Sequence, residues 1–328
     1  MARPGSELVT VFGGSGFVGA QTVRALARQG WRVRVAVRKP HLAVHLKPQG
    51  DVGQIQLIAC DVSDDAQVAA ALEGASAAIN LVGILFETPG RRFQSLQAQA
   101  PARIARACAA RGITRFVQVS AIGADAASES RYARTKAEGE TGARVALPST
   151  VVIRPSVVFG RGDDFLNRFA AMASFAPALP LPGGGETKFQ PVYVGDVAQA
   201  IANALSDPTA AGRTYELGGP ETWTFRRILE FVLAETGRKR ALLPLPWPVA
   251  SLIGTLSSPL TWVGLKPPLT ADQVILLQSD NVPAEGAPGL TELGVSPTGM
   301  EAVAASYLWR YRRGGQFAEV APAQSALT

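Results

Sequence analysis

Short runs of apolar and β-branched residues alternate with segments of helical periodicity through the first half of the chain. Each run has the length and composition of a strand buried on both faces of a parallel sheet. The predicted strands are 8–12, 32–37, 54–59, 75–81, 116–119 and 149–154. The predicted helices between them are one ending at Gly30, then 65–72, 93–111 and 132–145. This alternation predicts an α/β fold with a Rossmann-type, doubly wound parallel sheet, whose ligands bind at the carboxyl ends of the strands.

Beyond Pro155 the alternation loosens. The pattern predicts helices at 165–173, 196–205, 224–235, 271–278 and 299–313, and extended segments at 190–194 and 214–217. Residues 41–51 are expected to form a polar connection. We therefore expect a Rossmann domain over 1–155, with shared elements to about 205, and a smaller C-terminal α/β lobe over 156–328.

A glycine-rich stretch follows the first predicted strand at once. Its glycines are spaced Gly13-x-x-Gly16-x-x-Gly19, between a strand and a helix. Such glycines permit a tight turn, close approach of the backbone to a pyrophosphate, and close packing of helix on strand. The N–H groups that begin the helix then face the phosphates. The stretch predicts a dinucleotide site that includes Ser15, Phe17 and Val18.

The end of the second predicted strand bears on which dinucleotide is bound. An acidic residue there would bind the ribose 2′-hydroxyl, whereas an arginine suits a 2′-phosphate. The strand ends in Arg38 and Lys39, with no acid. NADP(H) is therefore favoured over NAD(H), and the alternative is that both cations are a solvated strand end.

Tyr132 and Lys136 lie four residues apart, on one face of a predicted helix. A nearby ammonium group stabilises a phenolate, so we expect Lys136 to lower the pKa of Tyr132. The ammonium can also reach ribose hydroxyls. After the fifth strand of a nucleotide-binding sheet, this pair is a candidate catalytic set.

Together these motifs resemble the extended, or atypical, short-chain dehydrogenases/reductases. The resemblance spans about residues 9–196 and rests on the glycine loop, the Tyr132–Lys136 pair, and the stretches 61–62, 80–83, 154–160 and 192–198. It implies Asp61 and Val62 near the adenine, Val82 and Gly83 near the ribose, and Lys136 on the nicotinamide ribose. It also implies a contact from Pro155 and a catalytic hydroxyl just past the fifth strand.

The catalytic hydroxyl is where this chain departs from the family pattern. Ser120 is present, but Ala121 stands where these enzymes usually carry a second Ser or Thr. Loss of that orienting donor is expected to cost several kcal/mol of transition-state stabilisation, by analogy with an oxyanion donor. Ser120 remains a candidate substitute through a shift of register, so the sequence leaves open whether the protein is an enzyme.

A narrower resemblance is carried by 130–140 and 269–281. These stretches are similar to the NADPH-binding accessory subunits of respiratory complex I and their bacterial relatives. In that subfamily the nucleotide is thought to be held structurally, close to the quinone-side joint of the complex. The resemblance implies complex I subunits as partners and a place at the cytoplasmic face of a bacterial inner membrane.

Composition narrows the class further. The net charge is +6 and the isoelectric point is about 9.6. We interpret the positive charge as spread along the sequence rather than gathered in blocks. No nucleic-acid motif accompanies it. Cys60 and Cys108 lie in apolar segments, so we expect a reducing, cytoplasmic compartment. No metal site is predicted: His41 and His45 are expected to be a surface pair, and Asp163 and Asp164 a helix cap with solvated charge.

An apolar segment at 242–265 is interrupted by prolines, which argues against a membrane-spanning helix. Two interpretations stay open for it. It forms a peripheral patch at a membrane or partner subunit, or it closes the second lobe over the cofactor.

Three functions follow from these observations. The first is a nucleotide-holding component of complex I. The second is a working NADP(H)-dependent reductase or epimerase/dehydratase with Tyr132 as acid/base. The third is a sensor of the NADPH/NADP+ ratio, which requires binding that is reversible and differs between the redox forms.

Overall fold

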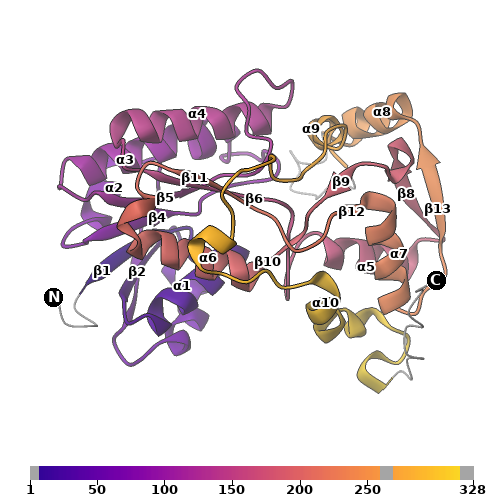
Figure 1. Cartoon of the computed structure of the whole chain (residues 1–328), viewed down its shortest axis with the longest axis horizontal. Coiled ribbons are helices and arrows are strands. Elements are labelled where there is room, and N and C mark those ends of the chain that lie inside the picture. The colour runs from indigo at the N-terminus through magenta and orange to yellow at the C-terminus, as the bar shows by residue number, and fades with distance from the viewer. Residues whose placement is uncertain (1–6, 259–268, 318–328) are drawn as a thin grey trace.

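A parallel sheet forms the centre of the computed structural model, which describes residues 7–258 and 269–317. Its seven strands follow the order β11-β6-β5-β4-β1-β2-β3 (Figure 1). They are β1 (Leu8–Phe12), β2 (Arg32–Val37), β3 (Ile55–Ala59), β4 (Ala77–Asn80), β5 (Arg115–Val119), β6 (Val151–Pro155) and β11 (Thr214–Leu217). The strand order reverses between β1 and β4, and in open sheets of this kind ligands bind at such a switch point.

Helices cover both faces of the sheet (Figure 1). One face carries α1 (Phe17–Arg28), α6 (Val194–Ser206) and the 3-10 helix η1 (Pro40–Gln49), and the other carries α2 (Asp65–Ala71), α3 (Ala100–Ala109) and α4 (Arg131–Ala146). A π-helical turn, η2 (Gln94–Gln99), leads into α3. Successive strand residues face opposite sides, so Val11 is buried under α1 while Phe12 is buried under α3 and α4.

The second lobe is built from short strand pairs and helices. β7 (Val158–Phe159) pairs with β10 (Val192–Tyr193), β8 (Ala178–Pro182) with β13 (Ala241–Leu245), and β9 (Lys188–Phe189) with β12 (Trp223–Thr224). The helices are α5 (Leu166–Phe175), α7 (Phe225–Glu235), α8 (Trp247–Ser257), α9 (Ala271–Leu276) and α10 (Met300–Leu308). Buried aromatic and aliphatic side chains from α5, α7 and α10 form one core with those of the strand pairs.

The chain returns to the first sheet after entering the second lobe. β11 pairs with β6 and adds the seventh strand, and Leu290, Leu293 and Val295 join the core under α1 and α6. The smaller C-terminal lobe is confirmed, while the boundary at residue 155 stays a prediction.

The predicted strands and helices of the first half are found at their expected places. Residues 41–51 differ: most of this expected polar connection is η1, because Ala43 and Leu46 are buried against the sheet layer. Two elements in the apolar segment were missed, β13 and α8, because Pro244 lies within β13 and Pro248 lies in the first turn of α8, and prolines argue against both kinds of element.

The expectation for Asp163 is half wrong. Its carboxylate does accept from the N–H groups of Phe165 and Asn167 at the start of α5. It is buried, however, and also accepts from the Tyr307 hydroxyl at 2.8 Å and from the Gly160 N–H. The charge is therefore not solvated, and it joins α10 to the start of α5.

Candidate functional site

The glycine turn between β1 and α1 has the geometry that its spacing predicts. Gly13 has φ of +78°, in the left-handed region that favours glycine. A Cβ there would also lie 3.0 Å from the backbone of Leu81 and Val82. A Cβ on Gly19 would collide with the Gly13 carbonyl, so α1 packs directly on the turn. These glycines bring the loop after β1 against the loop after β4.

Gly16 is different, because no described part of the chain requires glycine there. It is the N-cap of α1 with φ −76° and ψ 176°, and the nearest atom to an added Cβ would be the Gly13 carbonyl oxygen at 3.4 Å. Ser15 and Gly16 are exposed. The start of α1 carries no side-chain cap and no acidic residue, so the N–H groups near Phe17 and Val18 are left for an anion. This open helix end fits a pyrophosphate.

A buried amide pair supports the loop after β4. Asn80 donates to the Gln118 side chain at 2.8 Å and accepts from the Val82 N–H at 3.1 Å. Gln118 in turn donates to the Val119 carbonyl. The pair fixes the loop that carries Val82 and Gly83. The sequence did not single out Gln118, because a single polar residue in a strand does not indicate a hydrogen bond to a neighbouring strand.

Lys136 reaches this same loop from α4. A Cβ on Gly83 would lie 3.3 Å from the Lys136 Nζ, which itself lies 3.5 Å from the Val119 carbonyl oxygen. The Nζ is also 5.8 Å from the centre of the Tyr132 ring. The structure thus brings together Lys136, Tyr132, Gly83 and the end of β5, while the roles that the resemblance implies for them stay a prediction.

The pKa of Tyr132 is not lowered, contrary to expectation. Burial, and then the negative charge of Asp272, raises the pKa of Tyr132 to about 12. Burial lowers the pKa of Lys136 to about 8, against the opposing charge of Glu140. The sequence interpretation counted the charge of Lys136 and not the burial of both groups, which here decides the sign. Tyr132 is therefore a neutral hydroxyl at pH 7.

The pKa of Lys136 predicts how stability depends on pH in protein stripped of nucleotide. Below pH 8 the ammonium is charged in both states, so burial destabilises the fold, and above pH 10.5 it is neutral in both. We expect Lys136→Met to be more stable than the parent by about 3 kcal/mol at pH 7, and the difference to vanish near pH 10.5. Urea unfolding across this range measures it. A difference independent of pH would contradict the assignment.

Ser120 and Pro155 lie at the same edge of the sheet. The Ser120 hydroxyl is buried and has no hydrogen-bond partner among the described residues, while its N–H donates to Ile153. The Pro155 carbonyl accepts from Ile122. A buried hydroxyl without a partner beside Lys136 is a place for a polar ligand atom. Ala121 next to it supplies no second hydroxyl.

The adenosine end of the predicted site lies after β2 and β3. The Cys60 N–H pairs with Val37, which places Asp61 and Val62 beside the end of β2. Arg38 is exposed and makes no hydrogen bond or ion pair to described residues. Burial, and then the charge of Arg38, lowers the pKa of Arg91, so a second guanidinium lies near the first. The sequence interpretation missed Arg91, which a short hairpin-like turn brings back from residues 88–91.

Asp272 is the third residue of the site, after Gln118 and Arg91, that the sequence did not single out. It comes from α9, and its carboxylate accepts from the Ser130 hydroxyl at 2.9 Å, the Arg131 N–H at 2.7 Å and the Tyr132 N–H at 3.2 Å. A carboxylate at a helix N-terminus satisfies unpaired donors and complements the helix dipole. The helix that carries Tyr132 is thus held from a segment 140 residues away.

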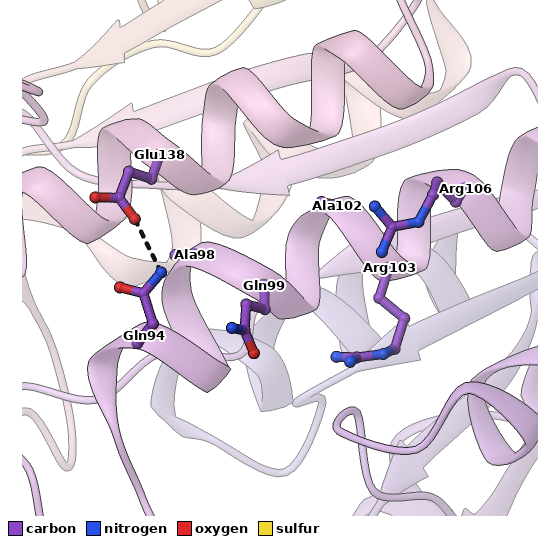
Figure 2. A pocket seen from close by; sticks show the side chains of 7 residues that line it. All are labelled: Gln94, Ala98, Gln99, Ala102, Arg103, Arg106 and Glu138. Carbon is purple, nitrogen blue, oxygen red and sulfur yellow. Dashed lines mark hydrogen bonds between the residues drawn. The ribbon is translucent and has the colours of Figure 1, made fainter.

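Two surface hollows lie away from these residues. One, of about 450 Å³, lies on the outer side of η2, α3 and α4 and is lined by Gln94, Arg103, Arg106 and Glu138 among others (Figure 2). The other, of about 520 Å³, is lined by Arg144, Arg154, Glu140 and Asp125 among others. Neither lining includes a predicted nucleotide or catalytic residue, so we assign the nucleotide to neither.

The apolar segment is described as far as Ser258, and 259–268 lie outside the described residues. Trp247 packs over Gly183 in the second lobe. On α8 only Ala250 and Gly254 are buried, while Leu252 and Leu256 are 59% and 72% exposed. Across residues 7–258 and 269–317, no helix is long and apolar enough to cross a bilayer. A peripheral contact through this segment stays a prediction.

Comparison with known proteins matches this geometry to a family. Residues 9–218 match the model of the NAD dependent epimerase/dehydratase family. The chain is 37% identical to mouse (Mus musculus) NADH dehydrogenase (ubiquinone) 1 alpha subcomplex subunit 9, mitochondrial, over 93% of this chain and 80% of that one. It is 29% identical to ceramide reductase of Caulobacter vibrioides over 78% of this chain and 79% of that one.

A solved structure agrees on the fold. The NADPH-dependent quinone oxidoreductase QOR2 of Escherichia coli, solved with NADPH, superposes with a TM-score of 0.70 at 19% identity, over 92% of this chain and 99% of that one. At that identity the likeness concerns the fold alone. The family match covers the glycine turn, the Tyr132–Lys136 pair and β11. The chain therefore belongs to the NAD-dependent epimerase/dehydratase family of extended short-chain dehydrogenases/reductases.

Proposed function

We propose that this protein is an NADP(H)-binding accessory or assembly component of respiratory complex I, the NADH:quinone oxidoreductase. In this proposal the nucleotide is held structurally, and the protein lies at the cytoplasmic face of a bacterial inner membrane. The relative from mouse, a named subunit of NADH dehydrogenase (ubiquinone), supports the partner.

One observation carries the structural role of the nucleotide. The parts that would hold a dinucleotide are present, whereas the catalytic set is incomplete at Ala121. The open end of α1, the unpartnered Ser120 hydroxyl and Lys136 fit the cofactor. The pKa of Tyr132 is raised to about 12, so at pH 7 the phenolate that could accept a proton is scarce and the phenol is a weak proton donor. When bound, the nicotinamide would supply or accept hydride, but the chain lacks the usual second hydroxyl to orient a carbonyl.

A second candidate is a working NADP(H)-dependent reductase or epimerase/dehydratase. Two observations favour it: Tyr132 and Lys136 do lie together, and one bacterial relative is a ceramide reductase. In this case Tyr132 would donate the proton and Lys136 would bind the ribose and stabilise a developing phenolate. Ser120 would then take the place of the missing hydroxyl.

Recovery of the tagged protein from detergent-solubilised membranes tests the first proposal. We expect it to carry complex I subunits, to keep NADP(H) through dialysis and to show no turnover. Recovery without any respiratory-chain subunit would contradict the proposed partner. Hydride exchange that Tyr132→Phe abolishes would establish the second candidate, and weak binding biased between NADPH and NADP+ would support a redox sensor.

The preference for NADP(H) has its own test. Arg38→Asp removes a charge-assisted contact to the 2′-phosphate, worth about 1.5–3 kcal/mol, and adds repulsion. We expect the affinity for NADPH to fall at least about tenfold, with the affinity for NADH unchanged or raised. Calorimetry measures both, and Arg106→Asp, an exposed arginine on α3, is the matched control. Equal affinities of Arg38→Asp and the parent for NADPH would show that Arg38 is only a solvated strand end.

A further inference from the structure

The net positive charge of this protein is concentrated in one stretch of the sequence and is not spread along the chain. Residues 8–50 contain seven Lys and Arg and no Asp or Glu, whereas the rest of the chain contains 25 Lys and Arg against 26 Asp and Glu. These 43 residues, counted from 8 through 50, form β1, α1, β2 and η1. The net charge of +6 therefore comes from one continuous part of the Rossmann domain.

Most of these cations face solvent. Among the seven, Arg34 is the one whose side chain forms hydrogen bonds with described residues, because it donates to the carbonyls of Ala71 and Glu73. The other six are exposed and form no hydrogen bond or ion pair through their side chains with described residues. They are Arg24, Arg28, Arg32, Arg38, Lys39 and Lys47. An uncompensated basic surface of this kind attracts anionic partners.

The helix η1 gives this surface its pattern. In a 3-10 helix, side chains three residues apart eclipse one another and form straight ridges. One ridge, Pro40-Ala43-Leu46, packs inward, with Ala43 and Leu46 buried. The other two ridges are exposed. On one of them Val44, 51% exposed, lies between His41 and Lys47.

The third ridge repeats the arrangement. Leu42 is 66% exposed and lies between Lys39, at the N-cap, and His45. Each protruding apolar side chain is thus flanked along its ridge by one lysine and one histidine, and the two apolar side chains lie on different ridges. Next to η1, α1 presents Arg24 and Arg28 from one exposed face.

We propose that η1, with the exposed cations of α1, binds the surface of an anionic phospholipid bilayer. Phospholipid headgroups supply a layer of negative charge with acyl chains beneath it, and single apolar side chains next to lysines can enter that layer. A folded acidic protein is the poorer fit, because protein interfaces have an apolar core within a polar rim, and η1 has no such core. The inference does not depend on whether the nucleotide turns over or on complex I.

Sedimentation of the full-length protein with lipid vesicles tests this proposal. We expect binding to mixed phosphatidylcholine–phosphatidylglycerol vesicles and none to pure phosphatidylcholine. The binding should weaken steeply from about 0.01 to about 1 M salt, as the Debye length falls from about 30 to about 3 Å. Lys47→Glu should lower the partition coefficient at least about fivefold. Leu42→Ser with Val44→Ser should lower it about tenfold.

Two control variants distinguish this surface from others. Lys239→Glu makes the same change of charge at an exposed lysine of the second lobe, and Leu256→Ser removes an exposed apolar side chain of α8. Both should bind as the parent does. The proposal is overturned if anionic vesicles do not bind at low salt, which would leave the surface to an acidic protein. The proposal is also overturned if Leu256→Ser abolishes vesicle binding while the η1 variants still bind. The same holds if Lys239→Glu weakens vesicle binding as much as Lys47→Glu does. Unchanged thermal melting shows that each variant is folded.

Discussion

Gly16→Ala is expected to lower the affinity for NADPH at least about a hundredfold without destabilising the free protein. Gly16 has an ordinary backbone conformation, and an added methyl group would meet only the Gly13 carbonyl oxygen, at 3.4 Å. The methyl group would instead occupy the space in front of the α1 N-terminus, where a pyrophosphate must approach the backbone. At a hundredfold, the loss is about 2.7 kcal/mol of binding free energy.

The matched control is Gly299→Ala. Gly299 is also an N-cap glycine, with φ −67° and ψ 147° at the start of α10, and an added Cβ there has no neighbour closer than 3.9 Å. Both variants should unfold in urea at the concentration that unfolds the parent, while only Gly16→Ala loses binding by calorimetry. Full affinity in Gly16→Ala would mean that the nucleotide does not approach this helix end, and the predicted site would be wrong.

The second large effect is expected at Asp272. Asp272→Ala removes three hydrogen bonds to a carboxylate and a favourable charge at the start of α4. Water replaces part of the lost hydrogen bonding, so we expect the free energy of unfolding to fall by about 3 kcal/mol and Tm to fall by roughly 5 °C. Asp272→Asn, which keeps one acceptor oxygen but no charge, should lie between.

The same substitution should also change the ionisation of Tyr132. The charge of Asp272 is the second cause, after burial, that raises the pKa of Tyr132. Its removal is expected to lower that pKa, which absorbance titration against Tyr132→Phe can follow. Glu285→Ala, at an exposed acidic residue of the same C-terminal region, is the control and should change neither quantity. Parent-like values in Asp272→Ala would show that α4 does not need this contact.

The nucleotide loop could be predicted from the sequence because its determinants are local. The glycine spacing, the flanking strand and the helix lie within about 30 consecutive residues, and each has its own periodic signal. Tyr132 and Lys136 could be paired for the same reason, since four residues along a helix are neighbours. Six strands of the sheet followed from the alternation of strands and helices, whereas the place of β11 beside β6 did not.

What the sequence could not predict depends on contacts between distant segments. Asp272 contacts the start of α4 only because α9 folds back over the first domain, and no sequence pattern near residue 272 predicts this contact. The rise in the pKa of Tyr132 needs the burial of the site, which a spacing does not give. In η1, a period of three with cations between apolar residues looks polar on average, so its two exposed ridges were missed.

The position of β11 has a consequence for synthesis of the chain. When β6 leaves the ribosome, its outer edge has no strand to pair with, because residues 156–213 must be made first. An unpaired edge of a sheet invites pairing with other chains. The nascent protein therefore passes through a stage in which about a third of the second lobe has been made while the sheet of the first domain is still open on one side. Chaperone contact at that stage would protect the edge until Thr214–Leu217 closes it.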